Sequence, residues 1–384
     1  MDTYKGEPSA WCAAVAGTVT GSWQHHRVLA VVCPGQGSQT PAMLAPWLEL
    51  PGVSELLATF SEASGVDLTA HGTTSDAPTI RNTAVAQPLI VAASLLSAQA
   101  IFGQRTPADL VDVTAGHSVG EFAAAGIAGV LSPTGAVALV SRRAQAMAQA
   151  AAAQPSGMSA IVGGSPEDVD AAIAAAAAST DGRLWPANIN ASAHTGRQQL
   201  VAGGSLEALA ALADQPPARA RVVPLDVAGA FHTPLMDQAR QDFEPICRQW
   251  PADDPSLTLL SNLDGASYDS ISSQPGVHGH GQGADVLARL AQQITAPVRW
   301  DLLSAQLEKL KVTGIIELAP GGVLSGLLKR SNKTVTNAAG QQMPVEIVTV
   351  KTPEDVDAAR DLILTHSHAA RVNRGQGLEG LMAQ

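Results

Sequence analysis

The chain has 384 residues, which is too many for one small domain and enough for a large core with a second lobe. Hydrophobic residues make up 46% and charged residues 15%, a composition that excludes an intrinsically disordered chain. The net charge of −11 argues against broad binding to nucleic acids or to acidic membranes, and we expect neither as a partner.

The cysteines and the two most apolar segments limit the possibilities further. The three cysteines are far apart and odd in number, which favours neither a disulfide framework nor a zinc site. We therefore expect no metal, no cofactor and a reducing, cytoplasmic location. Residues 1–26 lack a basic start and a cleavage site and are interpreted as an N-terminal extension. The uncharged stretch Asn82–Gln104 is interrupted by proline and polar residues, which predicts a buried helix.

Strand and helix signals alternate through the first 155 residues. The apolar run Val28–Val32 predicts a buried parallel strand, and Val111–Ala115 predicts the next one. Between them Ala84–Ala100 predicts a helix. A Ser-Pro pair predicts the start of a further helix at 133, which runs to about residue 153. This alternation indicates an α/β domain with a mainly parallel sheet.

The pattern changes near residue 155 and gives a β-α-β-β-α-β-like rhythm, typical of a small split βαβ lobe. The lobe is interpreted as inserted, because the earlier rhythm resumes with a strand at Gly314–Leu318. A last helix is expected to follow Thr352 and to end near Leu364. In the lobe, strands are expected at Met158–Gly163, Leu200–Gly204 and Arg221–Val227, with helices opening at Ser165 and Ser205.

These boundaries predict four parts. A discontinuous catalytic α/β domain is formed by 27–155 and 225–365, with the lobe 156–224 inserted into it. The N-terminal extension 1–26 precedes it, and residues 366–384 are expected to be a mobile tail.

A serine between two glycines is the strongest chemical signal. Residues Gly116–Gly120 read Gly-His-Ser-Val-Gly and separate a predicted strand from helix-forming residues. This arrangement forms a nucleophile elbow, in which glycines permit a sharp turn and the serine hydroxyl is exposed. The amides and dipole of the following helix would face a developing oxyanion. Ser118 is therefore a candidate nucleophile, and a tight turn with an incidental serine is the alternative.

Ser118 needs a general base, and the ten histidines differ in their setting. His117 adjoins the serine, but its side chain is expected to point elsewhere at such a tight turn. His194 is expected in a polar loop. His232 lies between a predicted strand end and a helix start, where a parallel α/β sheet exposes functional groups. The alternative for His232 is a core or capping histidine.

Arg143 is placed near the apolar face of its predicted helix, whereas Arg142 points almost the opposite way. An arginine that leans into a core is seldom left unpaired. Arg143 therefore either pairs with an internal carboxylate or binds a substrate carboxylate, for which its planar fork is suited.

Taken together and in their order along the chain, these motifs resemble those of malonyl-CoA:acyl carrier protein transacylases of bacterial type II fatty acid synthesis. The resemblance covers Val28 to Arg330, roughly four-fifths of the chain. Beside Arg143, it rests on Pro34–Gln39, Val85–Pro88, Gly116–Glu121, Gly229–His232, Pro297–Trp300 and Pro320–Leu324.

The resemblance implies that a malonyl group passes from malonyl-CoA to the phosphopantetheine thiol of acyl carrier protein. The transfer would be ping-pong, through a malonyl-serine, in a monomer. Ser118 would be the nucleophile and His232 its base. The backbone amides of Gln36 and Val119 would form the oxyanion hole, and the backbone carbonyl of Gln293 would orient His232.

The same resemblance implies the acyl-binding residues and the fold, with Arg143 holding the malonyl carboxylate. Val119 and Phe231 match members that leave little room for an α-methyl group. The large domain would be hydrolase-like and the inserted lobe ferredoxin-like. Gln87, Asn188, Asn190 and Phe231 would line the cleft between the lobes.

Two departures from the family pattern and one docking hypothesis remain. The loop from Asn190 to Gly196 is longer than usual, and Ala296 replaces the usual asparagine before Pro-Val-x-Trp. Carrier docking is expected to use a local basic patch despite the negative total charge: Arg142, Arg299, Lys329 and Arg330.

Three other functions are alternatives to malonyl transfer in fatty acid synthesis. An α/β-hydrolase esterase would need an acid between serine and histidine, and the available aspartates lie in or beside the inserted lobe. An esterase also gives no reason for Arg143. A docking module without activity predicts loss of Ser118 or His232, and both are present. An acyltransferase of a polyketide pathway remains open.

Overall fold

The structure is a computed structural model that describes residues 27–191, 199–269, 282–331, 334–336 and 341–366. The predicted N-terminal extension, His194 with most of the 190–196 loop, and residues 367–384 of the predicted tail lie outside the described residues.

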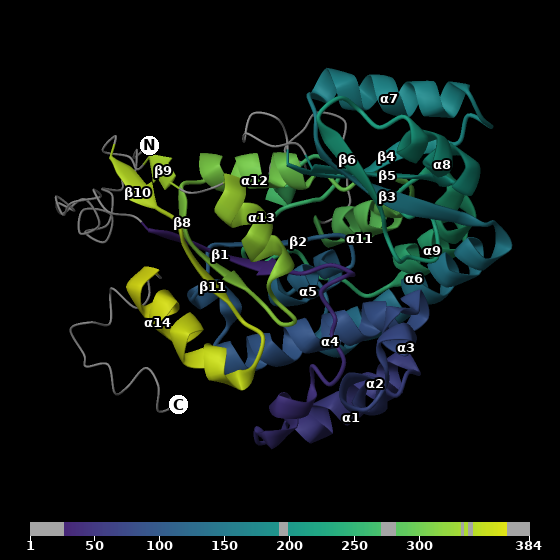
Figure 1. Cartoon of the computed structure of the whole chain (residues 1–384). Helices are drawn as coiled ribbons and strands as arrows, with labels where there is room; N and C mark the ends of the chain where they lie inside the picture. Colours follow the sequence, from purple (N-terminus) through teal and green to yellow (C-terminus); the bar gives the residue numbers. More distant parts are fainter. Residues whose placement is uncertain (1–26, 192–198, 270–281, 332–333, 337–340, 367–384) are drawn as a thin grey trace, which may run out of the picture.

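A parallel sheet forms the centre of the molecule, in the strand order β11-β8-β1-β2-β7 (Figure 1). Every pairing in it is parallel, which confirms the predicted mainly parallel sheet. Strand β1 lies in the middle, and its Val32 pairs with Ala115 on one side and Glu317 on the other. The inner strands are almost wholly buried, which explains their apolar sequences. The strands are β1 (Val28–Cys33), β2 (Val113–Gly116), β7 (Thr258–Leu259), β8 (Val312–Glu317) and β11 (Glu346–Thr349).

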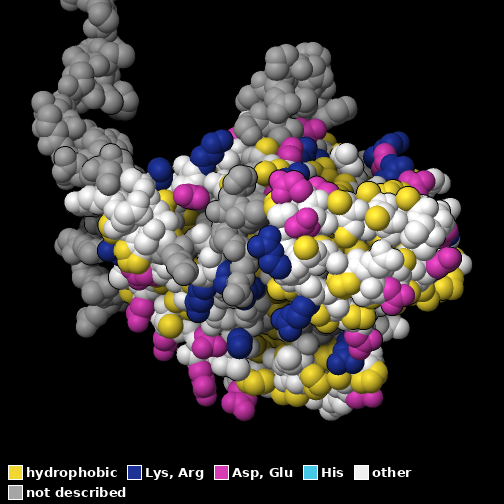
Figure 2. Space-filling model, turned by 45° about the horizontal axis from the view of Figure 1, so that its top comes forward, with side chains coloured by type: hydrophobic (Ala, Val, Ile, Leu, Met, Phe, Trp, Pro, Cys, Tyr) yellow, Lys and Arg dark blue, Asp and Glu magenta, His cyan; other side chains and the backbone are white. Residues whose placement is uncertain are grey.

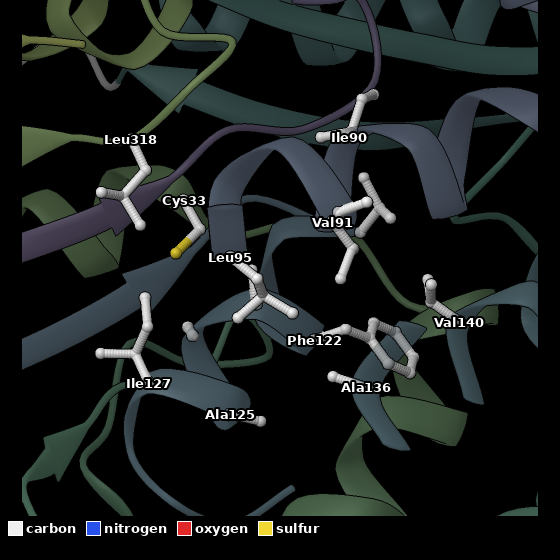
Figure 3. Packing of buried hydrophobic residues seen from close by; sticks show 14 of the residues in the cluster. Cys33, Ile90, Val91, Leu95, Phe122, Ala125, Ile127, Ala136, Val140 and Leu318 are labelled. Carbon is white, nitrogen blue, oxygen red and sulfur yellow. The ribbon is translucent and has the colours of Figure 1, made fainter. Parts of the chain in front are cut away.

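Helices cover both faces of this sheet. On one face, α12 (Trp300–Lys309) and α13 (Val323–Ser331) pack their apolar side chains against β1 and β8. On the other face, the larger core is formed with α4 (Thr83–Phe102), α5 (Gly120–Ile127) and α6 (Pro133–Ala153). Figure 3 shows part of this second core, where side chains of the strand ends and of α4, α5 and α6 meet.

Helix α4 is long and apolar enough to cross a membrane by length and composition alone. In the structure 83% of its most apolar window is buried inside the protein. Ser94 on this helix donates a hydrogen bond to the backbone oxygen of Ala319, at 2.8 Å. These contacts place α4 as the buried core helix that the sequence predicts.

A second, antiparallel sheet has the strand order β4-β5-β3-β6, and two helices pack against it. Its elements follow each other as β-α-β-β-α-β. Strand β4 has no counterpart among the strands expected from the sequence, and the strand expected at Arg221–Val227 ends earlier, at Pro224. The elements are β3 (Ser156–Gly163), α7 (Pro166–Ala178), β4 (Leu184–Ala191), β5 (Gln199–Ser205), α8 (Leu206–Asp214) and β6 (Ala220–Pro224).

The small sheet is hydrogen-bonded to the large domain through β4. The amide of Ile189 donates to the oxygen of Val298 at 2.8 Å, and the amide of Val298 donates to Ala187 at 2.9 Å. Polar residues of β4 are thereby held beside the carboxyl edge of the central sheet.

Serine caps define several helix starts as predicted. The side chains of Ser132, Ser165 and Ser205 each accept a backbone hydrogen bond at the first turn of α6, α7 and α8. Thr352 forms a capping box with Asp355 before α14 (Val356–His366). His366 is buried in this last helix, so the prediction that the tail starts at 366 is wrong by one residue.

The remaining strands form a two-stranded antiparallel pair, β10-β9, and the remaining helices complete the described fold. They are α1 (Val53–Ser64), α2 (Leu68–Thr73), α3 (Ala77–Arg81), α9 (Asp237–Gln249), α11 (Gln282–Gln292), β9 (Thr334–Thr336), β10 (Gln342–Pro344) and the 3₁₀ segments Ala45–Glu49, Pro107–Asp109, Pro234–Met236, Gln293–Thr295 and Pro353–Asp355.

Candidate active site

Ser118 occupies a strained turn between β2 and α5. Its φ angle is +53°, in the left-handed region that costs energy for a residue with a side chain. A Cβ on Gly116 would lie 2.0 Å from the carbonyl carbon of Gly120, and one on Gly120 would lie 2.2 Å from the oxygen of Cys33. The glycines are therefore required for close backbone approach, and the left-handed turn is made by the serine itself.

Asn262, just beyond the carboxyl end of β7, braces this turn from the neighbouring strand. Its side-chain oxygen accepts the backbone amide hydrogen of Ser118 at 2.6 Å, and its side-chain nitrogen donates to the oxygen of Gly116. Both bonds are buried, and together they stabilise the strained conformation at the serine.

His232 lies in hydrogen-bond contact with the serine. Its Nε2 is 2.7 Å from the Ser118 hydroxyl oxygen, and its Nδ1 is 2.9 Å from the backbone oxygen of Gln293. Because a carbonyl oxygen only accepts, Nδ1 carries the proton and Nε2 is left to accept from the hydroxyl. Among the described residues, neither ring nitrogen contacts a carboxylate.

The environment keeps His232 neutral. Burial, followed by the nearby charge of Arg143, lowers the pKa of His232 to about 3. The neutral ring is the form that can take a proton from serine. Its placement differs from the prediction in one respect: the strand before it is β6 of the antiparallel sheet, which ends at Pro224, and not a strand of the parallel sheet.

Arg143 is 1% exposed and points toward the serine. Its two terminal nitrogens donate to the side-chain oxygen of Gln87 at 2.7 Å and to that of Gln293 at 2.6 Å. The second nitrogen also lies 3.3 Å from the Ser118 hydroxyl oxygen. In the described part of the chain Arg143 forms no ion pair, so pairing with an internal carboxylate is not observed.

Burial lowers the pKa of Arg143 to about 10, which leaves the guanidinium charged at neutral pH. Its positive charge contacts neutral amide oxygens and the face of Phe122, 5.7 Å away, and the nearby charge of Glu121 opposes the effect of burial on its pKa. A buried cation that forms no direct ion pair is suited to receive an anionic ligand group.

A cavity of about 400 Å³ joins these groups. Of the residues predicted from sequence, Gln36, Gln87, Asn188 and Phe231 line it beside Ser118, His232 and Arg143. In the described structure the backbone amides of Gln36 and Val119 have no hydrogen-bond acceptor, although Val119 itself is not part of the lining. The described residues contain no His, Cys, Asp and Glu group that could hold a metal ion.

Two predictions about Asn190 are corrected. Expected at the start of the loop 190–196, it lies on strand β4, as does Asn188. The side chain of Asn190 does not line the cavity; its oxygen accepts a hydrogen bond from Nε2 of His117 at 3.0 Å. His117 is among the residues that line the cavity, but its ring points away from the serine, as expected, toward Asn190 and Trp300.

Three groups in the site have no role in the sequence analysis: Asn262, the Gln293 side chain and the Glu121 carboxylate. Glu121 belongs to the quoted segment Gly116–Glu121, and a charged residue in the first turn of a helix between apolar neighbours is a signal for it. Asn262 follows an apolar strand, where parallel sheets expose functional groups. No local pattern indicates the second role of Gln293.

The parallel α/β fold and the serine–histidine pair at its carboxyl edge define a class of protein, namely one equipped for nucleophilic catalysis through serine. The acyl transferase domain model matches residues 30–265. The malonyl CoA-acyl carrier protein transacylase of Mycobacterium tuberculosis is 43% identical over 335 residues, 87% of this chain and 100% of that protein. That of Mycolicibacterium smegmatis is 41% identical over 83% of this chain and 100% of its own length.

Solved structures agree with these relatives. The crystal structure of MCAT from M. tuberculosis has a TM-score of 0.75 at 43% identity and covers 87% of this chain and 100% of that one. A malonyl-transacylase in complex with a type II polyketide acyl-carrier protein has a TM-score of 0.71 at 26% identity, with coverages of 87% and 99%. This chain therefore belongs to the acyl transferase family, in its malonyl CoA-acyl carrier protein transacylase branch.

Proposed function

We propose that this acyltransferase moves the malonyl group of malonyl-CoA to the phosphopantetheine thiol of acyl carrier protein and so supplies fatty acid elongation. The names of its relatives support the reaction. The observation that carries it here is the guanidinium of Arg143, which is buried, forms no ion pair with the described residues and lies 3.3 Å from the serine oxygen. It would receive the free carboxylate of the malonyl group in a bidentate contact.

In the first half-reaction the hydroxyl oxygen of Ser118 attacks the thioester carbonyl carbon, and its proton passes to Nε2 of His232. The amides of Gln36 and Val119 would stabilise the resulting oxyanion, by about 3 kcal/mol for each donor. The carbon–sulfur bond then breaks, and the CoA thiol leaves with the proton from His232. This leaves a malonyl-serine ester.

The second half-reaction runs through the same groups in reverse. The carrier thiol gives its proton to His232 and attacks the ester carbonyl, and the bond to the serine oxygen breaks as that oxygen regains the proton. One site thus serves both thiols in turn, which is ping-pong transfer. Because Gln293 presents a backbone carbonyl, His232 works as half of a pair and not within a Ser-His-acid triad.

The architecture is proposed to divide as the resemblance implies. Residues 27–155 and 225–365 would form the hydrolase-like catalytic domain, and 156–224 the ferredoxin-like insert. The β-α-β-β-α-β order supports the latter. The same resemblance implies a monomer. The free thiols of Cys33 and Cys247 support a cytoplasmic location.

The acyl pocket is proposed to favour malonyl over its α-methyl analogue. Phe231 lines the cavity beside the base, and Val119 is buried beside the nucleophile. One additional methyl group in an apolar pocket changes the free energy of binding by about 1–3 kcal/mol, so the preference is partial.

The decisive experiment offers the purified protein malonyl-CoA alone and measures the mass of the Ser118 peptide. We expect one malonyl group on Ser118 and its discharge when acyl carrier protein is added. S118A is the matched control and should remain unlabelled. Loss of the label to water without transfer would favour the esterase and would contradict the proposal.

A polyketide carrier is the second candidate acceptor, favoured by the similarity to the malonyl-transacylase solved with such a carrier. Discharge of the malonyl-enzyme by each carrier under matched conditions decides between them.

The proposed docking residues Arg142, Lys329 and Arg330 are exposed, and Arg299 contacts Asp301 at 2.9 Å. Lysine and arginine side chains form separate groups on the face in Figure 2. Charge reversal at Lys329 and Arg330 should raise the KM for carrier; an unchanged KM would remove these residues from the docking surface.

A further inference from the structure

Glu121 is a buried carboxylate that lies behind the active site. It is 4% exposed, belongs to the first turn of α5 and does not line the cavity. One of its oxygens accepts the backbone amide of Asn262 at 2.8 Å, and the other accepts the side-chain nitrogen of Gln293. A buried carboxylate needs hydrogen-bond donors to offset the free energy of its burial. The two donors of Glu121 belong to distant parts of the chain, and the carboxylate holds them in place.

The first of these partners is the amide group of Gln293. Its nitrogen faces Glu121 and the oxygen of Ser118, and its oxygen faces Arg143 at 2.6 Å. A carboxylate can only accept hydrogen bonds, so it fixes the amide with the nitrogen toward itself. The amide oxygen is thereby directed to Arg143, while the main-chain oxygen of the same residue holds His232.

The second partner is Asn262, which bonds both ends of the turn at the nucleophile. Its backbone amide donates to Glu121, and its side chain bonds Ser118 and Gly116. One carboxylate is therefore connected, through one intermediate residue each, to the nucleophile, the base and the arginine.

We propose that Glu121 is a positioning residue of this acyltransferase, which orients Gln293 toward Arg143 and His232 and holds the Ser118 turn through Asn262. The effect through Arg143 rests on the proposed malonyl transfer. The effect on Ser118 and His232 does not, because it applies to any reagent that reacts with the serine.

The conservative variant E121Q tests the proposal because it keeps the size of the side chain. Its amide has one acceptor oxygen for two donors, so its nitrogen must face either Asn262 or Gln293. When the Gln293 amide turns so that its oxygen accepts from the new side-chain nitrogen of the variant, the Gln293 nitrogen faces the guanidinium of Arg143. The site then loses orientation without losing a reacting group.

Two reagents separate the two effects. Phenylmethanesulfonyl fluoride carries no carboxylate and reports on the serine and histidine alone: the serine oxygen bonds to sulfur, fluoride leaves, and the proton passes to His232. Malonyl-CoA reports on these groups and on Arg143 as well. We expect E121Q to lower the sulfonylation rate about 10-fold and malonylation about 100-fold, the losses for one neutral and one charge-assisted hydrogen bond.

E317Q is the matched control. Glu317 is also buried, and its carboxylate accepts the backbone amides of Leu324 at 2.9 Å and Ser325 at 2.7 Å, away from the cavity lining. Folded E317Q should react with both reagents at the wild-type rate. The proposal would be overturned if E121Q and E317Q reacted at equal rates, whether both kept the wild-type rate or both lost it to the same extent.

A second variant keeps the test decisive if E121Q does not fold. Q293M removes the amide and retains the main-chain carbonyl that faces His232. The ratio of malonylation to sulfonylation should fall about 10-fold in this variant; an unchanged ratio overturns the proposed connection to Arg143. If the wild-type protein is sulfonylated but never malonylated, the proposed function fails, and the sulfonylation rate of E121Q still decides the role of Glu121.

Discussion

Two strand-to-helix junctions at the carboxyl edge of the central sheet each bury a glutamate and use it differently. At the β8–α13 junction, both bonds of the Glu317 carboxylate go to backbone amides of the helix that follows it. At the β2–α5 junction, the bonds of Glu121 go to Asn262 and Gln293, more than a hundred residues away. The two carboxylate oxygens of Glu317 cap the helix that follows it in the chain. The carboxylate of Glu121 instead bonds distant segments and fixes how those segments lie relative to each other. The same residue type thus stabilises one junction and organises the other.

The largest effect on acyl transfer at the β2–α5 junction is expected from removal of the proposed nucleophile, Ser118. S118A should lower acyl transfer by about 10⁴-fold or more, because no other group replaces the serine oxygen. Its thermal stability should not fall, because the substitution removes only the hydroxyl and keeps the backbone groups that Asn262 contacts. A covalent malonyl adduct on the S118A protein, measured by intact mass, would contradict the assignment of the nucleophile.

The next effect concerns the charge behind the serine. R143A should lower malonyl transfer by about 100-fold, the loss of a charge-assisted bidentate contact. Transfer of an acetyl group, which has no carboxylate, should fall much less. The kcat/KM of both acyl-CoA thioesters decides this, and an unchanged preference for malonyl would show that Arg143 does not select the acyl group.

The pH dependence provides a smaller test of the β2–α5 junction. Burial raises the pKa of Glu121 to about 7, against the opposing effects of its bonds to Asn262 and Gln293 and of the charges of Arg289 and Arg143. Below that pH the carboxyl is protonated, and one of its oxygens carries a hydrogen that faces the N–H donor of Asn262 or of Gln293.

Sulfonylation of Ser118 should therefore slow by about 10-fold as the pH falls through 7, toward the rate of E121Q. The pKa of His232 is about 3, so the histidine remains neutral over this range and does not produce the loss. The E121Q rate should be flat across neutral pH. A wild-type rate that is flat there as well would show that the protonation of Glu121 does not reach the serine.

The smallest catalytic effect is expected at the β8–α13 junction. In E317Q the side-chain nitrogen of the new glutamine faces one of the two backbone amides that begin α13. This mismatch should lower the free energy of unfolding by about 1–3 kcal/mol. Thermal melting measures the loss, and the kcat/KM of the folded protein should stay at the wild-type value. A fall in kcat/KM without a change in melting temperature would mean that this junction also organises the site.

Much of the fold could be predicted from local signals. Continuous apolar runs indicated the buried strands β1, β2 and β8, because strands covered on both faces have no polar side. Serine caps and prolines located the starts of α6, α7 and α8. Strand β4 was missed because its alternating apolar and polar residues, with Asn188 and Asn190, read as a polar loop. It becomes a strand through its pairing with β5 and its contact with Val298.

By itself, the sequence determined the elements and the residues whose chemistry is local. The glycines around Ser118 and the core-facing side of Arg143 follow from backbone geometry and helical periodicity, which act over a few residues. Only the tertiary structure decided what those residues contact. The double role of Gln293, the brace formed by Asn262 and the buried position of Glu121 depend on distant segments that meet at one sheet edge, and hydrogen bonds between such segments leave no periodic pattern in the chain.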